Sequence, residues 1–319
     1  MPDKLVYSVV IPLFNKEKTI DRAIDSVLNQ NHDVELIVVD DGSTDNGPQK
    51  VKSRNDSRIR LIRQNNGGVS SARNIGINHS SHELVALLDA DDEWLPGFLD
   101  QIDALVAKCP NAGAYTTSYQ TVDNGETSVW QNKHITHPFI GIPDYFQCAR
   151  ATRGYSTYFC SSSIVLRIGA IKKIGGFRQG IGFGEDIDAW GRLALEYPIA
   201  HSSFILVNVY RDGENHASKK LRVDHHPFID SISLLLGSGP IMENYEMMKY
   251  VDKLVCLDAI RHLFGGKPTL ARNVLGMRPN DHFNLKILAL NILSFFPIRL
   301  LNAVRTSWQK IRPSSDFLR

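Results

Sequence analysis

Leu84-Val85-Ala86-Leu87-Leu88-Asp89-Ala90-Asp91-Asp92 is the stretch that decides the fold, an apolar run followed at once by three carboxylates. Such a short, continuous apolar run is typical of a strand buried on both faces of a sheet. In α/β sheets, ligands bind beyond the carboxyl ends of the strands. Three carboxylates in four residues repel one another unless positive charge lies between them. The stretch therefore predicts a ligand-binding edge that takes up a cation.

Strand and helix patterns alternate on both sides of this stretch. Buried-type strands are predicted over residues 6–12 and 35–39, a third strand over residues 58–63, and helices over residues 20–28 and 69–78. This alternation indicates a parallel sheet with helices on both faces. Asn15 follows the first strand and Asp40-Asp41 the second. The three polar clusters are therefore expected to share one edge of the sheet.

The pattern changes in the last third of the chain. Before it come a helix, a strand, a loop-rich stretch, a strand and two helices, predicted over residues 96–108, 113–119, 120–155, 158–167, 168–175 and 186–196. Beyond about residue 220 the segments are helix-like with few strand signals. We therefore expect an α/β domain over residues 1–220 and a helical C-terminal extension over residues 221–319.

Composition limits the possible functions. The chain has 319 residues, 43% of them hydrophobic, and a formal net charge of +2, which argues against a nucleic-acid-binding protein. No secretory signal or uninterrupted apolar stretch of about 20 residues is visible. The four cysteines are scattered and form no zinc-type spacing. We expect a cytoplasmic protein with reduced thiols.

The acids of residues 89–92 suit a divalent cation. Mg²⁺ and Mn²⁺ prefer oxygen ligands and commonly bridge protein carboxylates to phosphates. For Asp89 and Asp91, at the exit of a buried strand, we favour this metal site. For Asp92 the alternative is a turn in which the carboxylate caps the following helix.

Two further clusters could contact a nucleotide. An aspartate in residues 40–45 can accept a hydrogen bond from a base or a ribose, although a simple turn has the same composition. Gly67-Gly68 precedes a predicted helix, whose N-terminus attracts anions, and Arg73 adds a guanidinium suited to phosphate. The alternative is a plain loop–helix junction. The glycines match neither a Walker loop nor the dinucleotide-binding fingerprint.

Glu185 and Asp186 stand at the start of a predicted helix. Acids at that position stabilise any helix through its macrodipole. They could equally supply a general base that takes a proton from an attacking hydroxyl group. The residues alone leave both interpretations open.

Taken in order, these motifs resemble the family-2 glycosyltransferases of the GT-A fold. The resemblance covers about the first two-thirds of the chain and rests on Val9-Val10-Ile11-Pro12-Leu13-Phe14-Asn15, Val38-Val39-Asp40-Asp41-Gly42-Ser43-Thr44-Asp45, Ala72-Arg73-Asn74-Ile75-Gly76, Leu88-Asp89-Ala90-Asp91-Asp92, Gly175-Gly176-Phe177 and Glu185-Asp186 with Trp190.

The resemblance implies a role for each matching position. Pro12, Asn15 and Asp41 would line the nucleotide pocket, and Arg73 would lie near the nucleotide or its phosphates. Asp89 would face the ribose, and Asp91, with Asp89 beside it, would hold Mn²⁺ or Mg²⁺. Asp186 would be the catalytic base, with Glu185 as its neighbour. His216 resembles a metal ligand of some members, although a solvated histidine is the alternative.

The implied reaction is an inverting sugar transfer. The donor would be a nucleotide-diphosphate sugar, with UDP expected and GDP or dTDP as alternatives. The acceptor would be a hydroxyl of a glycan or lipid-linked glycan in surface polysaccharide biosynthesis. One rival is a catalytically silent nucleotide-sugar-binding partner of a glycan-assembly complex, against which Glu185-Asp186 argues. A second is a sugar nucleotidyltransferase, whose glycine-rich N-terminal loop is replaced here by residues 12–15.

Residues 285–312 carry apolar residues at helical spacing, flanked by Lys and Arg. This composition is typical of helices that lie on an anionic membrane surface. Packing on the catalytic domain or on a second subunit is the alternative. The expected location is therefore cytoplasmic, with peripheral membrane contact as one possibility.

Overall fold

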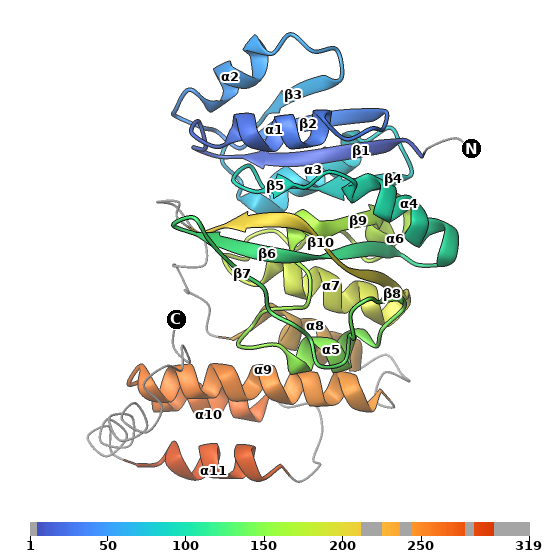
Figure 1. Cartoon of the computed structure of the whole chain (residues 1–319). Helices are drawn as coiled ribbons and strands as arrows, with labels where there is room; N and C mark the ends of the chain where they lie inside the picture. Colours follow the sequence, from blue (N-terminus) through green and yellow to red (C-terminus); the bar gives the residue numbers. More distant parts are fainter. Residues whose placement is uncertain (1–4, 212–224, 237–243, 278–283, 297–319) are drawn as a thin grey trace.

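The computed structural model describes residues 5–211, 225–236, 244–277 and 284–296 (Figure 1). Strands within these residues form one sheet: β1 (Tyr7–Leu13), β2 (Val34–Asp40), β3 (Ile59–Arg63), β4 (Leu84–Leu87), β5 (Glu93–Trp94), β6 (Ala114–Asp123), β7 (Glu126–Ser128), β8 (Ile140–Gly141), β9 (Ile164–Arg167) and β10 (Ile199–Tyr210). Their order is β3-β2-β1-β4-β9-β6-β10-β5, with β7 beside β6 and β8 beside β10.

The sheet is mostly parallel, as predicted. β3, β2, β1 and β4 are parallel neighbours, and so are β6 and β10. β9 is antiparallel to both β4 and β6, and therefore links the two parallel groups. The strand predicted over residues 158–167 is shorter in the structure. It begins at Ile164 because Ser161–Ser163 form a 3-10 turn, η1.

Helices cover both faces of the sheet. They are α1 (Ile20–Leu28), α2 (Gly47–Ser53), α3 (Val69–His79), α4 (Phe98–Lys108), α5 (Tyr145–Ala151), α6 (Ile168–Lys173) and α7 (Glu185–Glu196). Val9 and Ile11 of β1 pack in one core with α1 and α4, whereas Val10 faces the opposite core with α3 and α7. Strand β1 reads as a continuous apolar run because both of its faces are buried.

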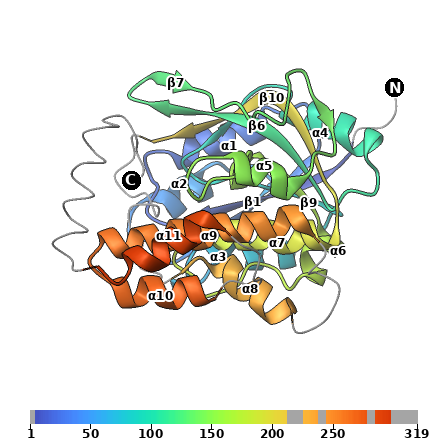
Figure 2. The same ribbon diagram turned by 90° about the horizontal axis from the view of Figure 1, so that it is seen from below.

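The C-terminal region is helical, as expected, and most of it lies at the bottom of the view in Figure 1, the side that Figure 2 shows from below. Its described helices are α8 (Pro227–Leu236), α9 (Tyr245–Phe264), α10 (Pro268–Gly276) and α11 (Leu285–Leu293). No helix in the described ranges is both long enough and apolar enough to span a membrane.

One hydrophobic core joins the C-terminal helices to the rest of the molecule. Phe228 of α8 packs against Gly191 of α7, where an added Cβ would lie 2.3 Å from the Phe228 ring. The ring of Tyr250 in α9 lies 6.0 Å from that of Phe228. The predicted division at residue 220 stays a prediction, but side chains from both sides of it share this core.

Candidate active site

The polar residues that follow β1, β2 and β4 lie at one edge of the sheet. Asn15, with φ of 52°, follows β1, and its backbone N–H donates to Ser43 Oγ (3.1 Å) in the loop after β2. The Asn15 side chain accepts from the Thr44 N–H at 2.8 Å. Pro12 lies opposite Val39 of β2, two residues past Val10, the last residue of β1 that pairs with β4. Proline can occupy this position because little hydrogen bonding is lost there.

Asp41 fixes the loop that opens α3. Its carboxylate accepts hydrogen bonds from Gly67 N (2.7 Å), Gly68 N (2.9 Å) and the Gln64 side chain (2.5 Å). Gly68 has φ of 84°, which favours glycine, and precedes the first residue of α3. The neighbouring Asp40 accepts from the Ser43 N–H, as expected for a turn. The two aspartates therefore have different structural tasks.

A buried guanidinium connects three parts of the predicted site. Arg73 of α3 donates to Asp89 Oδ1 after β4 (2.9 Å) and to Glu185 Oε1 at the start of α7 (3.1 Å). Its side chain is only 4% exposed, and it lies beside the Phe177 ring. Residues separated by up to 112 positions in the sequence are thereby brought into contact.

The acids at the start of α7 hold protons more tightly than free carboxyl groups do. Burial, followed by the charge of Asp186, raises the pKa of Glu185 to about 7. Burial also raises the pKa of Asp186, with repulsion from Asp89 adding to it and attraction from Arg73 opposing it. A carboxylate with a pKa near the operating pH suits general acid–base chemistry.

Asp91 and Asp92 have different surroundings. Asp91 Oδ2 lies 2.6 Å from the Lys16 ammonium, and both side chains are partly exposed. Asp92 is buried and accepts hydrogen bonds from Ser162 Oγ (2.5 Å) and Tyr210 N (3.2 Å). Burial and the charges of Asp89 and Asp91 raise its pKa well above the usual value. Asp92 thus ties η1 and β10 to this loop, whereas the sequence suggested that it caps a helix.

The carboxylates of Asp89 and Asp91 fit part of a divalent-cation site. Mg²⁺ is commonly held by one or two carboxylates together with substrate phosphates. Within the described ranges, no three His, Cys, Asp or Glu side chains are grouped to hold a metal without such help. His216, the third predicted ligand, lies outside the described residues. The structure nevertheless accommodates a positive charge next to Asp91, because the Lys16 ammonium already contacts the Asp91 carboxylate.

Sequence reasoning missed Lys16 and Arg22. Arg22 of α1 donates to the Asp91 carbonyl oxygen (2.5 Å) and stacks on Tyr210 with 3.5 Å between guanidinium carbon and ring centre. For Lys16, the position next to Asn15 just after β1 was the available signal; Arg22 lies within α1 and had none. Their partner, however, lies about 70 residues away.

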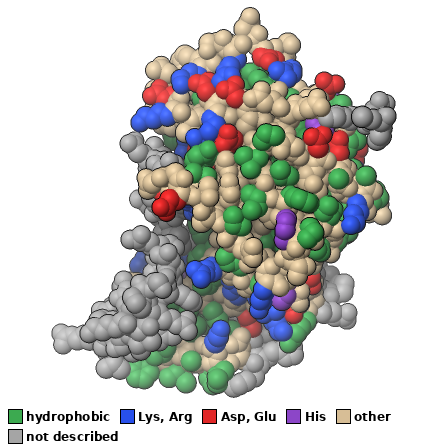
Figure 3. Space-filling model, in the orientation of Figure 1, with side chains coloured by type: hydrophobic (Ala, Val, Ile, Leu, Met, Phe, Trp, Pro, Cys, Tyr) green, Lys and Arg blue, Asp and Glu red, His purple; other side chains and the backbone are tan. Residues whose placement is uncertain are grey.

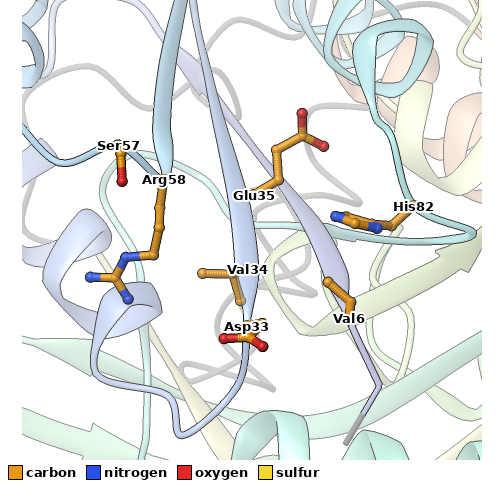
Figure 4. A pocket seen from close by; sticks show the side chains of 7 residues that line it. All are labelled: Val6, Asp33, Val34, Glu35, Ser57, Arg58 and His82. Atoms are coloured by element: carbon orange, nitrogen blue, oxygen red, sulfur yellow. The ribbon is translucent and has the colours of Figure 1, made fainter.

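A hollow of about 330 Å³ lies at the opposite edge of the sheet (Figure 4). Its lining residues precede or begin the parallel strands: Val6, Asp33, Val34, Glu35, Ser57, Arg58 and His82. The acids described above follow the other ends of the same strands, so this hollow is not part of the candidate site.

Comparison with curated proteins finds glycosyltransferases. One is the Escherichia coli UDP-Glc:alpha-D-GlcNAc-diphosphoundecaprenol beta-1,3-glucosyltransferase WfgD, 36% identical over 39% of this chain and 49% of that protein. A further match is the minor teichoic acid biosynthesis protein GgaA of Bacillus subtilis, 34% identical over 30% of this chain and 24% of that protein. The chain thus matches less than half the length of either relative.

Solved structures show the same fold. S. aureus TarS 1-349 in complex with UDP-GlcNAc superimposes with a TM-score of 0.70 and 18% identity, covering 96% of this chain and 92% of that chain. The complex of TarS 1-349 with UDP gives a TM-score of 0.66 at 17% identity. These neighbours confirm the predicted GT-A fold.

The family model for "Glycosyl transferase family 2" matches residues 8–175, which is more than half of the chain. The matched region contains the loops after β1, β2 and β4 together with α3. It therefore includes every predicted site residue except those at the start of α7 and His216. The predicted membership is confirmed: the chain belongs to glycosyl transferase family 2.

Proposed function

We propose that the chain transfers a sugar from a UDP-sugar to a hydroxyl group of a glycan or lipid-linked acceptor during surface polysaccharide synthesis. The observation that carries this proposal is the contact of Arg73 with Asp89 and Glu185, beside the partly exposed Asp91. The relatives support the substrate classes, because WfgD is named for a UDP-Glc donor and a diphosphoundecaprenol acceptor, and TarS was solved with UDP-GlcNAc.

Each part of the site then has a task. Asp41 holds the Gly67-Gly68 loop, and the backbone N–H groups at the start of α3 can face donor phosphates. Asp89 and Asp91, with His216 as a further predicted ligand, would hold Mn²⁺ or Mg²⁺. When bound, the metal would offset the negative charge that develops on the leaving diphosphate.

Asp186 acts as the base. It takes the proton of the acceptor hydroxyl as that oxygen attacks the anomeric carbon from the face opposite the diphosphate, which inverts the configuration. Burial, which raises the pKa of Asp186 above that of a free aspartate, makes it a stronger base than an exposed carboxylate. Glu185, held by Arg73, keeps the start of α7 next to the end of β4.

Donor turnover tests this proposal. UDP release from a panel of UDP-sugars should require Mn²⁺ or Mg²⁺ and should nearly vanish in Asp91→Ala and in excess EDTA. Asp100→Asn, on an exposed position of α4, serves as the control. Turnover that persists unchanged in EDTA contradicts the metal role. UDP-sugar binding without any turnover, with every acceptor tried, would favour the catalytically silent binding partner.

The exposed face of α11 supports contact with a membrane as a second part of the proposal. Its apolar side chains Leu285, Leu288 and Ile292 are 69%, 45% and 54% exposed. Figure 3 shows hydrophobic side chains along the lower edge of the molecule, where α11 lies in Figure 1. The rest of the predicted surface, residues 297–312, lies outside the described residues.

Liposome flotation tests the membrane contact. Replacing Leu288 and Ile292 with glutamate should reduce flotation with anionic vesicles, because the charges would have to enter the apolar boundary. Ile142→Glu, at an apolar position that is 52% exposed and distant in sequence, is the matched control. Equal flotation of all three proteins would reject a membrane role for α11.

A further inference from the structure

Lys16 forms an ion pair with the aspartate that is expected to bind the metal. Its Nζ atom lies 2.6 Å from Asp91 Oδ2, with side-chain exposures of 18% and 19%. An ammonium is a compact point charge, and at this distance it occupies space next to the carboxylate oxygen that a metal ion would need. A metal ion at Asp91 would have to share the carboxylate with this ammonium, and the two positive charges would repel each other at such short range.

The backbone on both sides of the pair is held in place. Arg22 donates to the carbonyl oxygen of Asp91 at 2.5 Å. On the other side, Asn15 N donates to Ser43 Oγ (3.1 Å) and Glu17 N donates to Asp45 Oδ2 (2.8 Å), which fixes both neighbours of Lys16. Of the Lys16–Asp91 ion pair, the lysine side chain is therefore the part that can change position while the backbone on both sides keeps these contacts.

The other acid of the pair has a different kind of partner. Arg73, which contacts Asp89, is 4% exposed and is also bonded to Glu185. Moving Arg73 would break two ion pairs at once and leave the Glu185 carboxylate, whose side chain is 15% exposed, without its partner, which is unfavourable. Moving the partly exposed Lys16 costs far less, because water and other anions can solvate its ammonium. Asp91 is thus the acid whose partner is exchangeable.

We infer that Lys16 and a divalent cation compete for Asp91, so that the lysine holds the metal position closed until a nucleotide diphosphate enters the site. This inference rests on the metal site of the proposed function. Entry of the diphosphate would supply the metal with further oxygen ligands and give the displaced ammonium an anionic partner. The donor-free chain should therefore bind the metal weakly, and nucleotide and metal should strengthen each other's binding.

Mn²⁺ binding to the full chain, measured from the EPR signal of free Mn²⁺, tests the competition without any activity assay. Lys16→Met keeps most of the side-chain volume and removes the charge. It should tighten Mn²⁺ binding at least about threefold in the absence of nucleotide, as expected for loss of a partly exposed ion pair. UDP should then strengthen Mn²⁺ binding less in this variant than in the wild type. Lys18→Met, at the exposed position two residues on, is the control and should match the wild type.

The outcomes separate the two levels of the proposal. Asp91→Asn should lose Mn²⁺ binding both with and without UDP. If that variant binds Mn²⁺ like the wild type, or if none of the proteins binds Mn²⁺ even with UDP, the proposed metal site at Asp91 is refuted. The inferred competition with Lys16 is then refuted as well. If Asp91→Asn loses the metal but Lys16→Met binds it no more tightly than Lys18→Met does, the site stands and the competition is refuted.

Discussion

Replacing Glu185 with glutamine should make the chain less sensitive to pH. In the fold, the Glu185 carboxyl group lies in a largely buried site beside Asp186. Both factors disfavour its ionised form, and the positive charge of Arg73 offsets only part of this effect. The pKa of Glu185 rises from 4.5 to about 7. Between these values the folded chain binds more protons than the unfolded chain. The free energy of unfolding must therefore fall as the pH rises through this window.

The size of the effect follows from the shift. At about 1.4 kcal/mol for each pKa unit, the shift corresponds to about 3 kcal/mol over the full window. The Glu185 side chain is only 15% exposed, so solvent screening removes little of this. Between pH 5 and pH 8 about 2.5 kcal/mol of the loss remains, because the unfolded chain is already partly ionised at pH 5. Glutamine does not titrate and should escape this loss.

Urea unfolding at pH 5 and pH 8, followed by tryptophan fluorescence without metal or donor, measures the difference. The stability of Glu185→Gln relative to the wild type should increase by roughly 2–3 kcal/mol between these two pH values. Glu196→Gln, at the exposed far end of α7, should follow the wild type. Equal loss of stability in wild type and Glu185→Gln would show that Glu185 titrates normally and would refute the reasoning.

Three further predictions concern single residues. Asp41→Asn weakens the hydrogen bonds to Gly67 and Gly68, so it should destabilise the chain by about 1–3 kcal/mol and weaken UDP binding in calorimetry; unchanged UDP affinity would contradict its role. Asp186→Asn should keep UDP affinity within about twofold yet abolish UDP release, since a base acts only in the chemical step; lost affinity would place it in the nucleotide site. Gly191→Ala should lower stability by about 1–3 kcal/mol, because the added methyl group meets Phe228, whereas Gly169→Ala has open space and should not; equal melting temperatures would argue against this packing.

The central strands could be predicted because burial on both faces leaves a plain apolar run in the sequence. β1, β2 and β4 are of this kind. β10 escaped prediction because polar residues such as His201 and Ser202 interrupt its pattern, although both are buried. His201 is accommodated by Thr116, whose Oγ1 lies 2.9 Å from its Nδ1, and that partner is 85 residues away. Local patterns do not contain such a pairing.

Helix α2 was also missed, for a different reason. It begins with Gly47-Pro48, two residues that are typical of turns, and so it was not predicted. Proline is favourable in the first turn of a helix because its missing N–H has no partner there in any case.

The sequence motifs predicted which residues belong to the site, but they did not predict which of these residues contact one another. The order of the motifs placed Arg73, Asp89 and Glu185 in one family pattern, and their roles stay predictions. That one guanidinium bridges the two acids depends on how α3 and α7 pack, over 112 residues of sequence. The pairing of Lys16 with Asp91 across 75 residues has the same origin.

A crystal structure of the chain with UDP and Mn²⁺ would test the central claim most directly. Anomalous density for Mn²⁺ is expected at Asp91, with the diphosphate of UDP bound to the metal. The uracil base is expected on the Asp41 side of the same edge of the sheet. Nucleotide bound instead at the opposite edge, for example in the hollow lined by Glu35 and His82, would contradict it.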